Sequence, residues 1–196
     1  MRALLAVGLL AAMAASIGAQ GTELKVGDPA PNFKLQASDG KTYQLSDFKG
    51  KKAVVVAWFP KAFTQGCTIE CKSLAENGDK IQKYQVAYFM ASTDKIEDNI
   101  AFAKATSVTL QGRNGQPTGT VVEKKEADFP ILSDPDKAIA KSYGVLAANG
   151  AFAQRWTFYI DKDGKISYIE KMVNPAKSAE DMVAKLGELK VTMNHH

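Results

Sequence analysis

The sequence predicts an α/β fold with a mixed central β-sheet flanked by helices, and three observations lead to this prediction. Two continuous runs of β-branched and aromatic residues, 53–59 and 86–93, are typical of strands buried on both faces of a sheet. Stretches that favour helices alternate with the strands. Turn signals at residues 38–41 and 162–165 indicate a hairpin near each end of the chain. For 196 residues, one domain suffices.

The individual elements follow in chain order. Pro60 ends the first buried strand, and Asn77-Gly78 weakens the middle of the helix that follows. The last helix has Ser178 as its expected N-cap and Asp181 three residues on, an approximate capping box. The expected strands cover residues 33–36, 42–45, 53–59, 86–93, 129–132, 155–161 and 166–173, and the expected helices cover 68–84, 96–104, 135–143 and 178–189.

One polar, glycine-rich stretch, residues 106–127, interrupts this alternation. It separates a helix from a strand that usually lie only a few residues apart. Residues 108–110 and 120–122 could pair as a small hairpin. We interpret the stretch as an insertion and favour a surface excursion without chemistry. The alternative, contact with a partner, rests on its length alone.

The first 19 residues have the pattern of a secretory signal peptide. Arg2 precedes an apolar run from Ala3 to Ile17, and small residues follow. The run is shorter than the ~20 residues of a membrane span, although a retained membrane anchor is the alternative. We therefore expect a mature domain of residues 20–196, exported to a periplasm or the cell exterior and not attached to the membrane after cleavage.

The formal net charge of the chain is small and positive. Removal of the leader takes away one positive charge, Arg2, so the formal net charge falls from +4 to +3. Lysine-rich spots such as residues 49–52 have no interleaved aromatic side chains, and they are typical of a solvated surface. Nucleic acid is therefore not an expected partner.

Both cysteines of the chain, Cys67 and Cys71, lie in the stretch "FPKAFTQGCTIECKSL", residues 59–74. This spacing is compatible with a structural disulfide, a metal site or a redox reaction. In an oxidising compartment a nearby pair becomes a disulfide unless something keeps reducing it.

The surroundings of Cys67 favour the redox reaction. Cys67 follows a strand, Pro60 and Gly66, and stands where a helix is expected to start. Unpaired N–H groups and the positive end of the helix dipole stabilise an anion there, which would be the Cys67 thiolate. The thiolate is the nucleophilic form of cysteine. Thr64 can direct its hydroxyl to the sulfur or to a ligand oxygen, and Pro60 shapes the loop and removes one backbone donor.

Several separated motifs carry a family resemblance. Pro60, Thr64 and Cys67 form P-x-x-x-T-x-x-C, which resembles the active-site signature of peroxiredoxins, and Glu70 matches an acidic residue common there. The segment "RWTFYID" is similar to the family's R-x-T-F strand, whose arginine faces the reactive cysteine, which gives Arg155 that role. The segments "VGDPAPNF" and "FPILSDPDKAIAKSYGV" resemble the peroxiredoxin Q, or bacterioferritin-comigratory-protein-like, branch. The resemblance covers the mature chain except the insertion.

This resemblance implies a thioredoxin-like fold and a thiol peroxidase that needs no metal and no organic cofactor. Cys67 would attack a peroxide oxygen and become a sulfenic acid. Pro60, Thr64 and Arg155 would bind the peroxide as negative charge develops on it. The implied partners are hydrogen peroxide or an organic hydroperoxide and a thioredoxin-like or small-thiol reductant. The oligomeric state would be a monomer or a homodimer.

Cys71 is expected to resolve the sulfenic acid as a Cys67–Cys71 disulfide. Relatives in the peroxiredoxin Q branch often carry a resolving cysteine five residues after the reactive one, whereas the spacing here is four. Positions four apart in a helix have Cβ atoms about 5–6 Å apart, whereas a disulfide needs roughly 3.8 Å. The first turn of the helix would therefore have to unwind. The alternative is that Cys71 only packs and that an external thiol recycles Cys67.

Three other functions fit less well. The cysteine motif of exported copper chaperones with a thioredoxin-like fold resembles C-P-x-x-C-P, and a distant histidine is their third metal ligand. This chain lacks both prolines, and its only histidines are His195 and His196. A thiol–disulfide oxidoreductase would have C-x-x-C and a cis-proline at the position of Trp156. A non-catalytic redoxin-like binding module is disfavoured because Thr64, Cys67 and Arg155 are all present.

Overall fold

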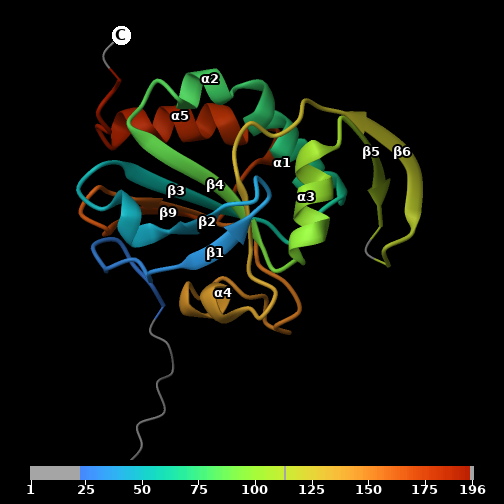
Figure 1. The fold of residues 1–196 in the computed structure, drawn as a ribbon, viewed down its shortest axis with the longest axis horizontal. Coiled ribbons are helices and arrows are strands. Elements are labelled where there is room, and N and C mark those ends of the chain that lie inside the picture. The colour runs from blue at the N-terminus through green and yellow to red at the C-terminus, as the bar shows by residue number, and fades with distance from the viewer. Residues whose placement is uncertain (1–22, 113, 195–196) are drawn as a thin grey trace, which may run out of the picture.

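The computed structural model describes residues 23–112 and 114–194, and it contains a seven-stranded sheet with helices on both faces (Figure 1). The strands are β1 (Lys34–Ala37), β2 (Thr42–Gln44), β3 (Ala53–Trp58), β4 (Val86–Ser92), β5 (Ser107–Gln111), β6 (Pro117–Glu123), β7 (Ile131–Ser133), β8 (Thr157–Ile160) and β9 (Ile166–Glu170). The helices are α1 (Gln65–Glu76), α2 (Gly78–Ile81), α3 (Ile96–Lys104), α4 (Ala138–Ser142) and α5 (Ser178–Glu188), with 3₁₀ turns η1 (Leu45–Phe48) and η2 (Pro175–Lys177).

The sheet has the strand order β2-β1-β7-β4-β3-β8-β9. The β3–β4 and β4–β7 pairs are parallel, and the other pairs are antiparallel. The predicted α/β class, mixed sheet and N-terminal hairpin are therefore confirmed. Every residue of β3 is buried, because the strand has a neighbour on each edge and helices over both faces.

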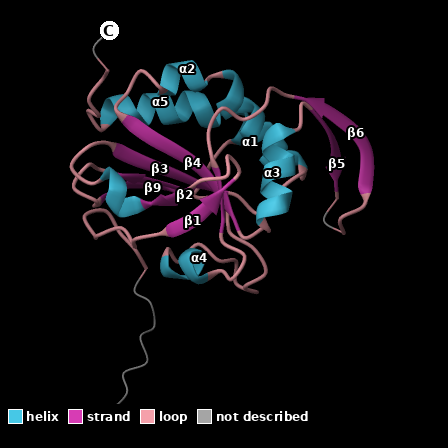
Figure 2. Ribbon diagram, viewed as in Figure 1, coloured by secondary structure: helices cyan, strands magenta, loops and turns pink. Residues whose placement is uncertain are grey.

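The two faces of the sheet carry separate cores. Figure 2 shows α1, α2 and α5 along one side of the strands and α4 on the other. Val55 and Ala57 of β3 belong to the core that includes both cysteines, whereas Val54, Val56 and Trp58 belong to the opposite core. The alternation of side chains along β3 thus divides its residues between the two cores. The end of β3 leads directly into the loop before α1, where Cys67 lies.

The helix predicted over residues 68–84 is wrong at both ends. The observed α1 begins three residues earlier and stops before Asn77, whose φ of −125° lies outside the helical range. Gly78 then approaches the next strand so closely that an added Cβ would lie 2.7 Å from the hydroxyl of Tyr88. The weak point expected at Asn77-Gly78 is therefore a break between two helices.

The predicted capping box of the last helix is also wrong. Lys177 occupies the N-cap position and makes no side-chain cap. The Ser178 hydroxyl instead donates to Oε1 of Glu70 on α1, at 3.5 Å. The predicted N-cap therefore joins α5 to the helix that carries the cysteines.

The helix predicted over 135–143 is shorter and begins after its proline. The observed α4 begins at Ala138, and the Asp134 carboxylate accepts the backbone N–H of Ala140 at 2.7 Å. This side chain satisfies a donor of the first turn that no intrahelical carbonyl can reach.

The insertion contains the expected hairpin, and the hairpin is longer than expected. Strands β5 and β6 pair with each other outside the main sheet. The hairpin is not a detached surface excursion, because the Gln111 N–H donates to the Phe63 carbonyl at 3.0 Å and Gln111 forms a parallel bridge with Thr64. The insertion therefore touches the loop that precedes Cys67, a contact that the sequence did not predict.

The leader expected at residues 1–19 lies outside the described residues. Of the helices in the described part of the chain, none combines the length and the apolar character that crossing a bilayer requires.

Candidate active site

Cys67 is the third residue of α1, and its side chain is fully buried. Its Sγ accepts a hydrogen bond from Nη2 of Arg155 at 3.2 Å. Arg155 precedes β8, which runs antiparallel to β3, so the chain returns to the end of β3 from which the Cys67 loop leaves. The structure therefore brings together Cys67 and Arg155, which lie 88 residues apart in the sequence.

Glu70 fixes the other side of the Arg155 guanidinium. Its carboxylate is fully buried, forms an ion pair with Nη1 of Arg155, and accepts a hydrogen bond from Ser178. Burial raises the pKa of Glu70 to about 7, although the charge of Arg155 opposes this shift. The guanidinium thus uses one nitrogen for Glu70 and another for Cys67. A fixed cation beside Sγ can stabilise negative charge on the sulfur or on a bound oxygen.

Thr64 is the N-cap residue of α1, but its hydroxyl does not reach the sulfur. It donates instead to the Lys61 carbonyl at 2.9 Å, so the expected bond to Cys67 is absent between these two described residues. Its oxygen keeps lone pairs that can accept a hydrogen bond from a bound molecule. Pro60 and Thr64 both line the cavity next to Cys67, as expected for residues that contact a substrate.

This cavity has a volume of about 1260 Å³. One part of its wall comes from the loop before α1 and from Arg155, and another from β5, β6 and residues 151–152. Cys67 is not a lining residue because its side chain is buried next to Arg155, which does line the cavity. Arg155 is therefore the link between the cavity and the sulfur.

Cys71 lies one turn further along the unbroken helix α1, and both cysteines are free thiols. Its side chain is fully buried, and burial raises the pKa of the thiol to about 12, with the charge of Lys124 acting in the opposite direction. A thiol in this environment is a poor nucleophile. Reaction between the two cysteines therefore requires that α1 open locally.

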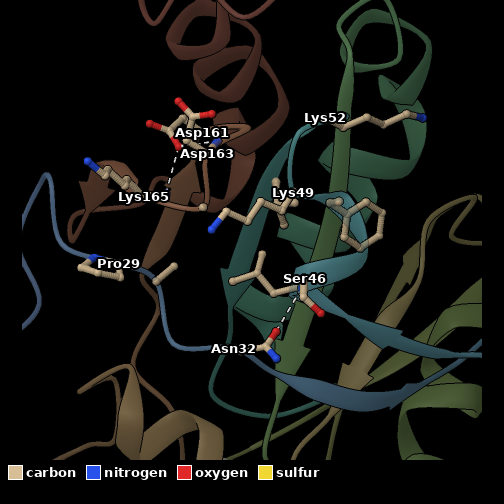
Figure 3. Close-up of a pocket in the computed structure, with 13 residues that line it drawn as sticks. Pro29, Asn32, Ser46, Lys49, Lys52, Asp161, Asp163 and Lys165 are labelled. Carbon is tan, nitrogen blue, oxygen red and sulfur yellow. Dashed lines mark hydrogen bonds between the residues drawn. The ribbon is translucent and has the colours of Figure 1, made fainter.

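A second cavity of about 350 Å³ lies at the other end of β3, and Figure 3 shows the residues around it. Its polar contacts are structural: Asn32 accepts the Ser46 N–H at 3.0 Å, and Asp161 accepts the N–H groups of Asp163 and Lys165 within their turn. No cysteine, serine–histidine pair or arginine is among the residues that line it. This cavity therefore offers neither of the two groups, a thiol and a guanidinium, that meet at Cys67.

Sequence reasoning missed two features of this site. Gly66 lies so close to Arg155 that an added Cβ would be 2.8 Å from Nη2. Phe63 has a φ of 65°, the left-handed region that non-glycine residues rarely adopt, and its ring packs against Phe102 with the centroids 5.2 Å apart. The length of the insertion was the one signal that pointed to the second wall of the cavity.

Among the described residues, no group of three or more histidine, cysteine, aspartate and glutamate side chains is placed to hold a metal ion. The two cysteines alone are a poor soft-metal site. The geometry of the site is that of a buried cysteine beside an arginine that a buried glutamate holds in place.

Known proteins with similar sequences are peroxiredoxins. The family model described as AhpC/TSA family matches residues 26–169. The peroxiredoxin Bcp of Escherichia coli K12 is 34% identical over 152 residues, which cover 74% of this chain and 85% of that protein. A chloroplast 2-Cys peroxiredoxin of Spinacia oleracea is 29% identical over 157 residues, 78% of this chain and 55% of the relative.

Solved structures confirm the thioredoxin-like peroxiredoxin fold. The peroxidoxin BcpB of Mycobacterium tuberculosis superposes with a TM-score of 0.68 at 24% identity, over 85% of this chain and 98% of that one. The matching family model covers most of this chain, and the Bcp relative is matched over most of its own length. The chain therefore belongs to the AhpC/TSA family, within the Bcp-like branch of the peroxiredoxins.

Proposed function

We propose that Cys67 is the peroxidatic nucleophile of this thiol-dependent peroxidase. The observation that carries the proposal is the contact of 3.2 Å between Nη2 of Arg155 and Sγ of Cys67, with the same guanidinium paired to the buried Glu70. This arrangement holds a cation where a thiolate and a polarised peroxide would both need it. The copper-chaperone and thiol–disulfide oxidoreductase alternatives are not favoured, because the relatives are peroxiredoxins.

The first step is attack of the Cys67 thiolate on one oxygen of the peroxide. An S–O bond forms as the O–O bond breaks, and the other oxygen leaves with a proton as water or alcohol. Cys67 becomes a sulfenic acid, so the sulfur is oxidised by two electrons and the peroxide is reduced. Arg155 stabilises the developing charge, and Pro60 and Thr64 position the peroxide beside it.

The second step is resolution by Cys71. Its thiol displaces the hydroxyl of the sulfenic acid, water is released, and a Cys67–Cys71 disulfide forms. The first turn of α1 must open, because Cβ atoms four residues apart in a helix are about 5–6 Å from each other. A thioredoxin-like protein or a small thiol then returns the disulfide to two thiols.

The test of the first step is the rate of peroxide loss with reduced protein and dithiothreitol. We expect Cys67→Ser to abolish turnover of hydrogen peroxide, whereas Cys71→Ser keeps Cys67 and still consumes peroxide, because dithiothreitol can reduce the sulfenic acid directly. Turnover by Cys67→Ser at the rate of the parent would show that Cys67 is not the nucleophile.

The test of the second step is the intact mass after one equivalent of peroxide without added thiol. The parent should lose two hydrogens and gain no oxygen, whereas Cys71→Ser should gain one or two oxygens on Cys67. An oxygen adduct on the parent as well would mean that Cys71 only packs in the core.

We also propose that the protein acts after export, because residues 1–19 have the signal-peptide pattern. Cell fractionation with an antibody against the mature domain, and N-terminal sequencing of the product, test this proposal. Full-length protein in the cytoplasmic fraction would contradict it.

A further inference from the structure

The hairpin β5–β6 forms a wall of the cavity at the active site. Leu110, Gln111 and Gly112 at the end of β5, and Thr118 and Thr120 on β6, line the same cavity as Arg155. Figure 1 shows the hairpin as a separate pair of strands next to α3, at the periphery of the molecule. A segment outside the main sheet thus borders the site of the chemistry.

Several contacts fix this wall against the body of the protein. The Gln111 N–H bonds to the Phe63 carbonyl at one end, and Lys72 Nζ of α1 donates to the Glu123 carbonyl at 2.5 Å at the other. Val108 and Leu110 are buried, with exposed fractions of 1% and 3%. The hairpin is therefore anchored both to the Cys67 loop and to the helix that carries Cys67.

The two faces of β6 differ in a way that the alternation of a strand explains. Thr118 and Thr120, two residues apart, line the cavity. Val121 is not among the lining residues and is 54% exposed. Substitutions at Thr120 and Val121 therefore change neighbouring positions on opposite faces of one strand.

A different segment supplies an apolar part of the lining. Ala151 and Phe152 lie shortly before Arg155 in the chain and also line the cavity, and the Phe152 side chain is 41% exposed. An exposed phenylalanine at the rim of a cavity offers apolar surface to a bound molecule.

The cavity is far larger than hydrogen peroxide requires. Its volume is about 1260 Å³, whereas a water molecule takes about 30 Å³ of liquid volume and a hydrogen peroxide molecule is of similar size. Sites for drug-sized molecules have volumes of about 300–1,000 Å³. There is room beside Arg155 for a substrate with a large carbon body.

We propose that the β5–β6 hairpin is a specificity wall that selects organic hydroperoxides by the size of their carbon body. This inference rests on the proposed function of Cys67. The body lies between the threonines of β6 and Phe152, and the hydroperoxide group points to Arg155 and Cys67. The sulfur takes the terminal oxygen, the O–O bond breaks, and the alkoxide leaves with a proton as the alcohol.

The experiment compares Thr120→Phe with its matched control Val121→Phe, using cumene hydroperoxide and hydrogen peroxide with dithiothreitol as reductant. The phenylalanine of Thr120→Phe fills part of the cavity and should lower kcat/KM for cumene hydroperoxide by about tenfold or more. A single methylene group too many or too few in a hydrophobic pocket already changes kcat/KM by about 10–200-fold. The value for hydrogen peroxide should change by less than about twofold, because its binding needs only the innermost part of the site. Val121→Phe should leave both values unchanged.

Equal losses for both peroxides in Thr120→Phe, or no loss for either, would overturn the role of the hairpin. Absence of peroxide turnover in the parent would instead overturn the proposed function, so the two failures are distinguishable. Should Thr120→Phe not fold, Phe152→Ala tests the same cavity from its other wall. Phe152→Ala should raise KM for cumene hydroperoxide and leave kcat/KM for hydrogen peroxide unchanged. An unchanged KM for cumene hydroperoxide would also contradict the proposal.

Discussion

At the scale of single residues, the site depends on how Arg155 is held. Glu70 binds one nitrogen of the guanidinium, Cys67 accepts from another, and Gly66 leaves room for it. Any change that moves the guanidinium should therefore affect the chemistry more than the stability.

Gly66→Ala should disturb catalysis without unfolding the protein. The added Cβ would lie 2.8 Å from Nη2, the nitrogen that donates to Cys67, so the guanidinium must move. A displacement of about 1 Å at a reacting group costs up to about 100-fold, and we expect a loss of roughly 10- to 100-fold in kcat/KM for hydrogen peroxide. The melting temperature should stay close to that of the parent, since alanine favours a helix more than glycine does.

The matched control for this change is Gly187→Ala in α5, where the added Cβ would lie 3.3 Å from the Tyr84 hydroxyl, away from Cys67. It should leave peroxidase activity unchanged. An active Gly66→Ala enzyme would mean that the position of Arg155 does not limit the rate.

Glu70 should make both activity and stability depend on pH. Burial raises its pKa to about 7, so the carboxylate loses its charge, and its hold on Arg155, as the pH falls through about 7. The folded-state pKa lies above the ordinary value of 4.5, so folding favours proton uptake, and this contribution to the free energy of unfolding is lost as the pH rises from about 4.5 to about 7. We expect Glu70→Gln to remove the transition in kcat/KM near pH 7 and to flatten the melting temperature across that window.

Glu76→Gln is the matched control, because Glu76 lies on the same helix and forms a surface pair with Lys72. Its pH profiles should follow those of the parent. A Glu70→Gln profile that keeps the transition near pH 7 would assign the titration to another group.

At the scale of the elements, the break between α1 and α2 has a packing cause. Gly78, the first residue of α2, packs closely against the side chains of Tyr88 and Asp128. A Cβ added at Gly78 would lie 2.7 Å from the tyrosine hydroxyl and 2.8 Å from a carboxylate oxygen of Asp128. Helix propensity alone predicts that alanine stabilises this position. The close approach predicts the opposite.

Gly78→Ala should therefore lower the free energy of unfolding by about 1–3 kcal/mol, the usual cost of overpacking. Urea titration followed by circular dichroism measures it. The double variant Gly78→Ala with Tyr88→Phe removes one of the two clashing groups and should recover part of the loss. A stabilised Gly78→Ala would show that propensity outweighs packing here.

The elements also show what the sequence could and could not predict. The sequence predicts strands at residues 53–59 and 86–93 because continuous burial leaves a continuous apolar pattern, and it predicts α3 at its observed bounds, 96–104. The C-terminal end of α1 and the role of Ser178 differ from the prediction because tertiary contacts of Gly78 and Ser178 decide them, whereas the start of α5 agrees with it. Pairing of Arg155 with Cys67 came from a family resemblance, whereas the wall formed by β5–β6 depends on contacts between segments that no local pattern records.

At the scale of the whole molecule, α1 carries both cysteines and is also a central part of one core. Cys67, Cys71 and Leu74 of α1 are all fully buried, and the core that contains them also includes Met182 and Leu186 of α5. The loop before α1 is in turn bonded to the hairpin through Phe63 and Gln111. Opening α1 for resolution must therefore weaken contacts in the core and at the cavity wall together.

We accordingly expect the oxidised protein to be less stable than the reduced one, although it gains a covalent bond. A disulfide that closes a loop of only five residues removes less entropy from the unfolded chain than one that closes a long loop, whereas unwinding the first turn of α1 exposes buried apolar side chains of the core. After one equivalent of hydrogen peroxide, the parent should melt at a lower temperature, and amide exchange should accelerate in α1 and β5. Cys71→Ser treated in the same way is the control, and it should keep the exchange pattern of the reduced protein because its helix need not open. An oxidised parent that melts above the reduced one, with α1 still protected, would mean that Cys67 and Cys71 do not bond within one chain.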